Sequence, residues 1–178
     1  MYKDVEKILV SKEELKERIS QLAKMLDEDY ANKRPLMICI LKGSVIFFSD
    51  LIREMKIPLE IDFMAISSYG ASTRSSGEVR MVKDLDRSIE NRHVVIVEDI
   101  VDSGYTLSYL KRMLMSRHPQ SIKICALLDK FERREVPLEV DYKGFDIGNE
   151  FVIGYGLDYA EAYRNLPEIC ILKRSVYE

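Results

Sequence analysis

The sequence predicts an α/β fold in which a central parallel sheet is flanked by helices. Short apolar runs at 36–41, 93–98 and 121–129 are typical of strands that are buried on both faces. Segments with helical spacing of apolar residues separate these runs, and such alternation favours a parallel sheet with crossover connections. Because there is no repeat, linker or low-complexity segment, we expect a single domain, 1–178.

The first half of the chain alternates helix and strand. Ser11 and Glu14 have the spacing of a capping box, and apolar residues recur at helical spacing through residues 11–31. The first buried run follows this helix. A second helix is predicted at 44–55, and a strand at 60–67 that begins with alternating polar and apolar residues.

The second half begins with a segment that has little to bury. Residues 68–81 are rich in Ser, Gly and Thr and predict a long mobile loop. The second buried run then leads into a helix at 106–117, and the third buried run follows. Shorter apolar pieces come around Val140, at 151–155 and at 169–172.

Composition excludes several classes of partner. Lys and Arg number 27 and Asp and Glu number 30, so the net charge of −3 offers no excess of cations to a nucleic acid or an anionic membrane. No apolar run approaches the roughly 20 residues of a transmembrane helix, and the first ten residues lack a signal-peptide core. Cys39, Cys125 and Cys170 lie in apolar segments without metal-ligand spacing. They predict buried, reduced thiols in a cytoplasmic protein.

Polar residues gather where the buried strands are predicted to end. These residues are Lys42, Gly43, Glu98, Asp99, Asp129 and Lys130. Because ligands bind at the carboxyl ends of parallel strands, this pattern predicts one site.

The segment VVIVEDIVDSGYTL places acids beside a turn of small residues. DSGYT (102–106) enters a predicted helix, where free backbone N–H groups and the helix dipole favour a monophosphate. An ordinary strand–turn–helix connection, capped by the Asp or the Ser, explains these five residues equally well. Glu98 and Asp99 change the balance, because adjacent acids at the end of a buried strand are costly to desolvate without partners. Ribose hydroxyl groups and a water-held Mg²⁺ ion are suitable partners. The segment therefore predicts a site for a ribose 5-phosphate.

The same segment resembles the phosphoribosyl-diphosphate signature of the type I phosphoribosyltransferase family, and most closely that of its purine-salvage members. Further blocks are similar to the family in the family's order and extend the resemblance over nearly the whole chain: ILKGSVIFFSDL, DFMAISSYG, ALLDK and FVIGYGLDYAEAYRNLP. The resemblance implies the family's fold, with a small hood lobe formed by chain-terminal segments. It also implies a Mg²⁺-dependent enzyme that joins hypoxanthine or guanine to 5-phosphoribosyl 1-diphosphate and gives IMP or GMP.

The resemblance implies that Asp102 is the general base that accepts the proton of the attacking purine nitrogen. Such a base typically contributes about 10²–10⁴ in rate. Helix capping is the alternative role for Asp102. The residues expected to bind the ribose and its phosphate are Glu98, Asp99, Asp102, Ser103, Gly104, Tyr105 and Thr106, with no individual role for Tyr105.

Other blocks supply the diphosphate and metal ligands that the resemblance implies. Lys42 and Gly43 match the family's diphosphate loop, where a cis peptide bond often precedes the lysine; a plain turn is the alternative. Arg164 matches a cation that meets the diphosphate. The metal ligands implied are Glu98, Asp99 and Asp158.

For the purine, the resemblance implies that Lys130 donates a hydrogen bond to the 6-oxo group. Lysine has donors and no acceptor, so it favours a carbonyl over the amino group of adenine. Phe151 is expected to stack on the purine while the backbone of Val152 reads its Watson–Crick edge, and Asp158 belongs to the same pocket. From the residues alone, a solvated strand-end lysine and a core strand are the alternatives.

Ser68 and Tyr69 match a residue pair in the lid loop of the family, which closes over the substrates and excludes water. A merely flexible loop is the alternative. The family also implies a homodimer or homotetramer that acts on small molecules, without nucleic acid or membrane partners.

Two other functions remain open. One is a phosphoribosyltransferase that accepts xanthine, which needs a group to recognise the 2-oxo position. The other is a non-catalytic regulator that senses the ribose diphosphate while binding RNA or DNA. Against the regulator stand the presence of Asp102, Lys130 and Arg164 and the net charge of −3.

Overall fold

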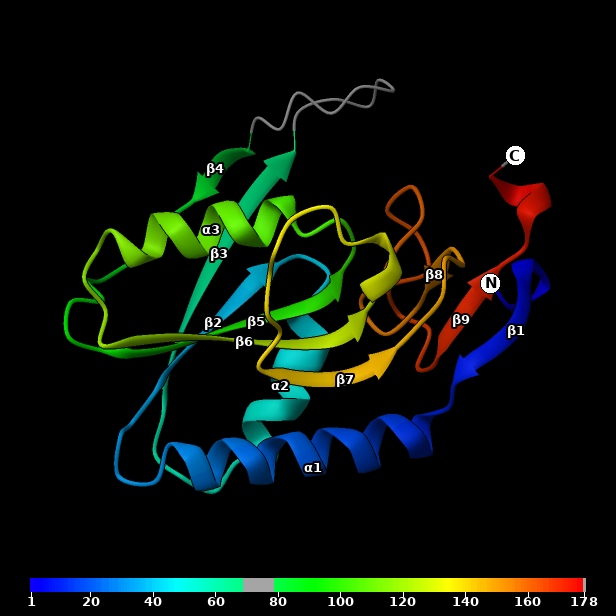
Figure 1. Ribbon diagram of the computed structural model, residues 1–178. Coiled ribbons are helices and arrows are strands. Elements are labelled where there is room, and N and C mark those ends of the chain that lie inside the picture. The colour runs from blue at the N-terminus through cyan, green and yellow to red at the C-terminus, as the bar shows by residue number, and fades with distance from the viewer. Residues whose placement is uncertain (69–78, 178) are drawn as a thin grey trace.

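The computed structural model describes residues 1–68 and 79–177, in which the chain forms two sheets and three α-helices (Figure 1). The larger sheet has six strands in the order β4-β3-β2-β5-β6-β7. Their bounds are Leu36–Leu41 for β2, Glu60–Ser68 for β3, Val79–Lys83 for β4, His93–Val101 for β5, Ser121–Asp129 for β6 and Tyr142–Asp146 for β7. The predicted strands at 36–41, 60–67, 93–98 and 121–129 are thus confirmed, with β5 longer than expected.

The sequence predicts a parallel sheet, but the larger sheet is mixed. Four neighbouring pairs are parallel, but β4 runs antiparallel to β3. Only residues 69–78 separate these two strands, which is too short for the crossover of a dozen or more residues that a parallel pair needs. The predicted loop at 68–81 is wrong at both ends, because Ser68 is the last residue of β3 and residues 79–81 already belong to β4.

The two faces of the larger sheet are covered by different helices (Figure 1). The helices are α1 (Lys12–Asp29), α2 (Val45–Glu54) and α3 (Tyr105–Met115). Met37 and Cys39 of β2 share a core with α1 and α2, whereas Ile38 and Ile40 share a second core with α3. Successive residues of a strand face opposite sides of a sheet, so the continuous apolar run of β2 supplies both cores.

The first helix begins as its sequence predicts. The backbone N–H of Glu14 donates to Oγ of Ser11 at 3.3 Å, and the Glu14 carboxylate accepts from the Ser11 backbone N–H at 2.8 Å. This capping box is confirmed, and the helix ends at Asp29, two residues before the predicted end. The three cysteines are buried and free, also as predicted.

The chain-terminal segments build the second, three-stranded sheet, which lies near the carboxyl ends of the strands of the larger sheet (Figure 1). Strands β1 (Val5–Val10), β9 (Ile169–Leu172) and β8 (Val152–Ile153) pair antiparallel in that order. Short 3₁₀ helices lie at Tyr2–Asp4, Phe131–Arg133 and Arg174–Val176. A role of this sheet as a hood over the site stays a prediction.

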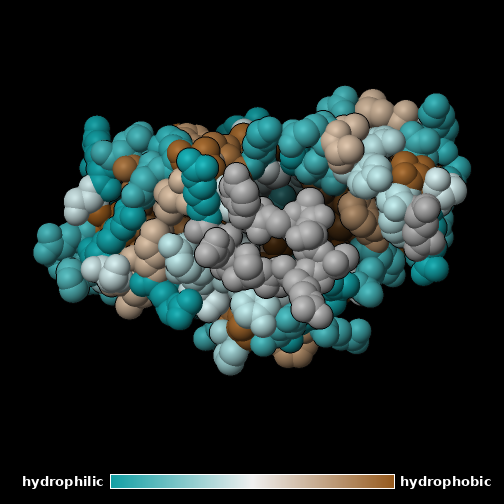
Figure 2. Space-filling view, turned by 90° about the horizontal axis from the view of Figure 1, so that it is seen from above, coloured by the Kyte–Doolittle hydropathy of each residue, from teal (hydrophilic) through white to brown (hydrophobic). Residues whose placement is uncertain are grey.

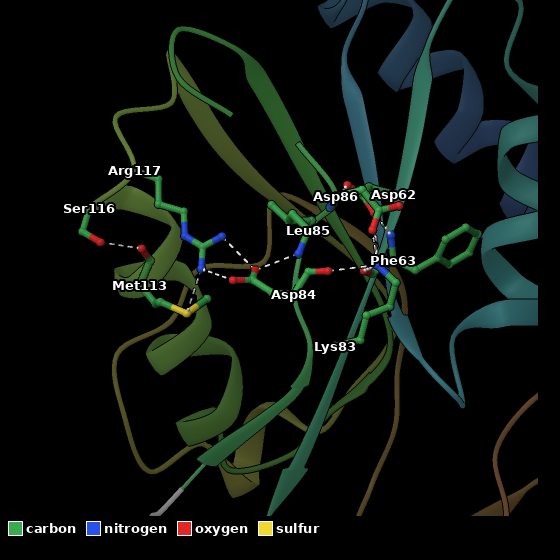
Figure 3. Close-up of polar contacts among 9 residues, drawn as sticks. All are labelled: Asp62, Phe63, Lys83, Asp84, Leu85, Asp86, Met113, Ser116 and Arg117. Carbon is green, nitrogen blue, oxygen red and sulfur yellow. Dashed lines mark hydrogen bonds and ion pairs between the residues drawn. The ribbon is translucent and has the colours of Figure 1, made fainter. Parts of the chain in front are cut away.

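A polar network fixes the segment that follows β4 (Figure 3). Nζ of Lys83 contacts Oδ1 of Asp86 at 2.9 Å and Oδ1 of buried Asp62 at 3.6 Å. The guanidinium of Arg117, just after α3, donates two bonds of 2.8 Å to the Asp84 carboxylate. The edge strand is therefore tied both to β3 and to the end of α3.

The surface is mostly hydrophilic on the face shown in Figure 2, with smaller hydrophobic areas between the polar residues. None of the helices in the described residues is both long and apolar enough to span a membrane.

Candidate active site

A hollow of about 350 Å³ lies at the carboxyl ends of β2 and β5, where the sequence predicts the site. The predicted residues that line it are Lys42, Gly43, Glu98, Asp99, Asp102, Ser103, Gly104, Thr106, Asp158 and Arg164. Tyr105 is 46% exposed and is absent from this lining in the described part of the chain. The structure thus brings together residues that are more than 120 positions apart in the sequence, as Lys42 and Arg164 are.

The turn at 102–106 leaves the start of α3 open. Gly104 is the N-cap, with φ of 87°, and a Cβ there would lie 2.8 Å from Cδ of Arg134. Such a left-handed, crowded position favours glycine. Within the described residues no side chain caps α3, so its first N–H groups are open to an anion. The alternative in which Asp102 caps the helix is therefore wrong.

Glu98 and Asp99 belong to β5 itself, three and two residues before its last residue, Val101. Oε1 of Glu98 accepts from Oγ of Ser44 at 3.0 Å and from the Asp99 backbone N–H at 3.2 Å. Oδ1 of Asp99 accepts from the Ile100 N–H at 2.7 Å. Burial raises the pKa of Glu98 well above its usual range, with the Asp99 charge adding to this effect, and burial also raises the pKa of Asp99. The pair is costly to ionise without a cation or a hydrogen-bond donor.

The loop after β2 fits closely between these acids and a late loop. A Cβ on Gly43 would lie 1.7 Å from Oδ2 of Asp99, and a Cβ on Gly156 would lie 1.9 Å from the Gly43 carbonyl oxygen. The peptide bond between Leu41 and Lys42 is cis, as the resemblance noted in the sequence leads one to expect. Nζ of Lys42 lies 3.1 Å from Oε2 of Glu161.

Arg164 brings a cation into the same hollow. Its Nη1 donates to the Gly156 carbonyl at 2.8 Å, and its Nη2 lies 2.8 Å from Oδ1 of Asp158. Its Nε is buried and has no hydrogen-bond partner among the described residues. A buried donor without a partner is unfavourable, so this atom has capacity to bind an anionic ligand.

A second hollow of about 660 Å³ adjoins the first and shares Asp99, Asp102 and Asp158 with it. The predicted purine residues Lys130, Phe151 and Val152 line it. Five further polar or aromatic residues line it that the sequence did not predict as site residues. These are Arg133, Asn149, Glu150, Arg174 and Tyr177.

Asp102 stands between two cations where the hollows meet. Its Oδ1 accepts from Nε of Arg133 at 2.6 Å, and its Oδ2 lies 3.9 Å from Nζ of Lys130. Lys130 is buried, and burial lowers its pKa. Its Nζ also donates to the Glu150 carbonyl at 2.8 Å, which shows that a carbonyl oxygen fits this donor.

Phe151 belongs to an aromatic cluster beside the second hollow. Its ring stacks on that of Tyr177, with centroids 5.0 Å apart and 28° between the planes, and meets Tyr159 edge-on at 5.6 Å. Phe151 remains 37% exposed. One of its faces is thus occupied by a residue from the last turn of the chain.

Of the predicted lid pair, Ser68 is the last residue of β3 and pairs with Val79, while Tyr69 lies outside the described residues.

The predicted metal ligands do not form a closed cluster. In residues 1–68 and 79–177 there is no group of three or more His, Cys, Asp or Glu side chains placed to hold a metal ion. Mg²⁺ is usually bound by one or two carboxylates together with water and substrate phosphates. Glu98 and Asp99 are partly buried and line the hollow, where their carboxylates provide the hard oxygen donors for such an open site, so these residues fit the ion.

Comparisons with known proteins agree with this geometry. A family model described as "Phosphoribosyl transferase domain" matches residues 7–160. Hypoxanthine-guanine phosphoribosyltransferase of Bacillus subtilis is 51% identical, and the match covers 100% of this chain and 99% of that protein. The enzyme of the same name from Streptococcus thermophilus is 49% identical, with coverage of 98% and 97%.

A longer relative and a solved structure add to the comparison. The bifunctional protein TilS/HprT of Listeria innocua is 51% identical over 99% of this chain, which spans only 27% of that protein's length. The crystal structure of a hypoxanthine phosphoribosyltransferase from Staphylococcus aureus superposes with a TM-score of 0.97 at 46% identity. That match covers 100% of this chain and 97% of the other.

Proposed function

The chain belongs to the phosphoribosyl transferase family, and on that premise we propose that it transfers the 5-phosphoribosyl group of 5-phosphoribosyl 1-diphosphate to hypoxanthine or guanine. It is a purine-salvage enzyme that gives IMP or GMP and releases diphosphate. One observation carries the assignment, namely that Asp102 lies where two hollows meet. Lys42, Gly43 and Arg164 line the first, which we propose binds the anionic groups and call the anion-binding hollow, and Lys130 and Phe151 line the second.

In this proposal the ribose 5-phosphate lies on the open N-terminus of α3, held by the backbone of residues 103–106. Ribose hydroxyl groups donate hydrogen bonds to Glu98 and Asp99, which removes the cost of their burial. The diphosphate meets the loop at Lys42 and Gly43 and the partnerless Nε of Arg164. Each charge of the substrate thus faces a group of opposite charge or a hydrogen-bond donor.

We also infer that Mg²⁺ takes part. Glu98 and Asp99 would hold it together with substrate oxygens, and Asp158, which pairs with Arg164 in this structure, is the third expected ligand. When bound, the ion neutralises charge on the departing diphosphate.

Asp102 accepts the proton of the purine nitrogen that attacks C1′, which raises the nucleophilicity of the base as the diphosphate leaves. Lys130 then donates to the 6-oxo group of the purine in place of the Glu150 carbonyl that it contacts here. Phe151 stacks on the purine, and Val152 reads its Watson–Crick edge. Adenine offers no carbonyl to Lys130 and is rejected.

We propose that the chain is one domain that assembles as a homodimer or homotetramer in the cytoplasm, acts on small molecules only and closes a loop around Ser68 and Tyr69 during turnover. The buried, free cysteines support a location in the cytoplasm, where thiols stay reduced.

Initial rates with 5-phosphoribosyl 1-diphosphate and each of hypoxanthine, guanine, xanthine and adenine test the proposal. We expect nucleotide formation from hypoxanthine and guanine, loss of activity with excess EDTA, and little product from adenine. Product from xanthine would broaden the substrate range. No product from any purine, with the ribose diphosphate still bound in calorimetry, would favour a non-catalytic regulator and overturn the proposal.

A further inference from the structure

Asp102 is part of a closed ring of polar contacts. On one side Arg133 donates from Nε to Oδ1 of Asp102 at 2.6 Å and from Nη1 to Oδ1 of Asn149 at 2.5 Å. On the other side Oδ2 of Asp102 lies 3.9 Å from Nζ of Lys130, which donates to the carbonyl of Glu150. Because Asn149 and Glu150 are neighbours in the chain, the ring closes.

The ring joins three separate segments of the site. Asp102 belongs to the turn after β5, Lys130 and Arg133 to the turn after β6, and Asn149 to the segment before β8. All these side chains line the second hollow. The carboxylate is therefore held from two directions at the place where the purine is proposed to bind.

We propose that Arg133 is a positioning residue for the base, an inference that rests on the proposed function. The last torsion of an aspartate side chain is broad, so the carboxylate does not hold one orientation by itself. The guanidinium is planar and always charged, and here its fork binds Asp102 and Asn149 together. Arg133 occupies Oδ1 and leaves Oδ2, the oxygen on the Lys130 side, to accept the proton of the purine nitrogen.

The exposure of the pair argues for orientation and against support of the fold. The side chains of Arg133 and Asp102 are 47% and 44% exposed. Ion pairs in such surroundings contribute little to folding stability. In contrast, a displacement of a reacting group by about 1 Å can lower a rate by about 10²-fold. A substitution at Arg133 is therefore expected to change turnover much more than stability.

Arg133→Met tests this directly. We expect kcat for hypoxanthine to fall by about tenfold or more, while KM for the ribose diphosphate and the thermal unfolding midpoint stay close to those of the wild type. Arg133→Lys keeps the charge and one donor, so it should recover part of the loss. Arg112→Met is the matched control, because Arg112 is exposed on α3 and does not line either hollow in the described residues.

A double-mutant cycle separates positioning from an independent role. If Arg133 acts through Asp102, then Arg133→Met combined with Asp102→Asn is no slower than Asp102→Asn alone. Additive losses would overturn the inference, as would an Arg133→Met variant that raises KM for the purine without lowering kcat. If the wild type is active and Arg133→Met has the same kcat, the inference about Arg133 is overturned while the proposed function stands. A wild type that is inactive with every purine would overturn both the proposed function and the inference about Arg133.

Discussion

Two glycines determine how closely the loops of the anion-binding hollow approach each other. The Cβ that Gly43 lacks would meet Oδ2 of Asp99, which is the tip of a side chain and can rotate away. The Cβ that Gly156 lacks would meet the Gly43 carbonyl, which is backbone, and the φ of Gly156 is +103°. Gly43 therefore controls where the Asp99 carboxylate lies, whereas Gly156 controls whether the loops can pack at all.

Gly43→Ala should damage binding and leave the fold intact. The new methyl group displaces the Asp99 carboxylate from its place, so we expect the affinity for the ribose diphosphate with Mg²⁺ to fall by about tenfold or more, equivalent to about 1.4 kcal/mol. Calorimetry measures this affinity, and thermal unfolding checks the fold.

Gly148→Ala is the matched control for this substitution. Its methyl group would also meet a carboxylate tip, Oε2 of Glu150 at 2.7 Å, but away from the anion-binding hollow. Affinity for the ribose diphosphate should be unchanged in this control. Equal losses in both variants would mean that added volume in a loop matters, and the position of Asp99 does not.

Single residues also show what the sequence could and could not predict about the site. Asp102 is visible because it opens a recognisable run of small residues. Arg133 is not, because it follows Lys130 in a charged stretch, FERREV, where a solvated side chain is the ordinary expectation. Its partners lie 31 and 16 residues away, and no local pattern links them.

At the scale of the element, the buried strands and amphipathic helices could be predicted because each carries its own periodicity. Strand β1 could not, since VEKILV mixes charged and apolar residues and five of its six side chains remain partly or fully exposed. It is a strand only because β9, from the other end of the chain, pairs with it. The antiparallel edge strand β4 was missed for a related reason, because pairing with β3 determines its structure.

Strand β5 places the Glu98 carboxylate partly buried at the wall of the anion-binding hollow, where a charge needs a partner. Glu98→Gln keeps the acceptor for Oγ of Ser44 and removes the charge. We expect thermal stability without metal to be equal to or above that of the wild type, because no buried charge needs compensation. In the presence of the ribose diphosphate, the additional stabilisation by Mg²⁺ should be smaller than in the wild type.

Scanning fluorimetry with and without Mg²⁺ measures this difference. Glu54→Gln, at the end of α2 and outside the anion-binding hollow, controls for the change of overall charge. An undiminished Mg²⁺ effect in Glu98→Gln would exclude Glu98 from the metal site.

At the scale of the whole molecule, the second hollow draws on both sheets. Asp102 and Lys130 follow strands of the six-stranded sheet. Phe151 immediately precedes β8 of the three-stranded sheet, Val152 is its first residue, and Tyr177 follows β9. The purine is thus proposed to bind between two parts of the chain whose relative position depends on the pairing of the two chain ends. This dependence is the reason that no local segment of the sequence predicted Tyr177.

Tyr177 should matter for the purine and not for the ribose diphosphate. Its ring stacks on Phe151 and lines the second hollow. The Tyr177 ring holds Phe151 in its present orientation, and an aromatic contact of this kind contributes about 0.5–1.5 kcal/mol beyond its buried area. Loss of the ring frees Phe151 to turn away from the purine, so we expect a comparable loss of purine stacking and a rise in KM for hypoxanthine of about 2- to 12-fold. Steady-state kinetics of Tyr177→Leu measure this change, with KM for the ribose diphosphate expected to stay constant because Tyr177 does not line the first hollow in the described residues. Tyr177→Phe keeps the ring and should behave as the wild type. A lower KM for hypoxanthine in Tyr177→Leu would instead mean that Tyr177 occupies the face of Phe151 that the purine needs.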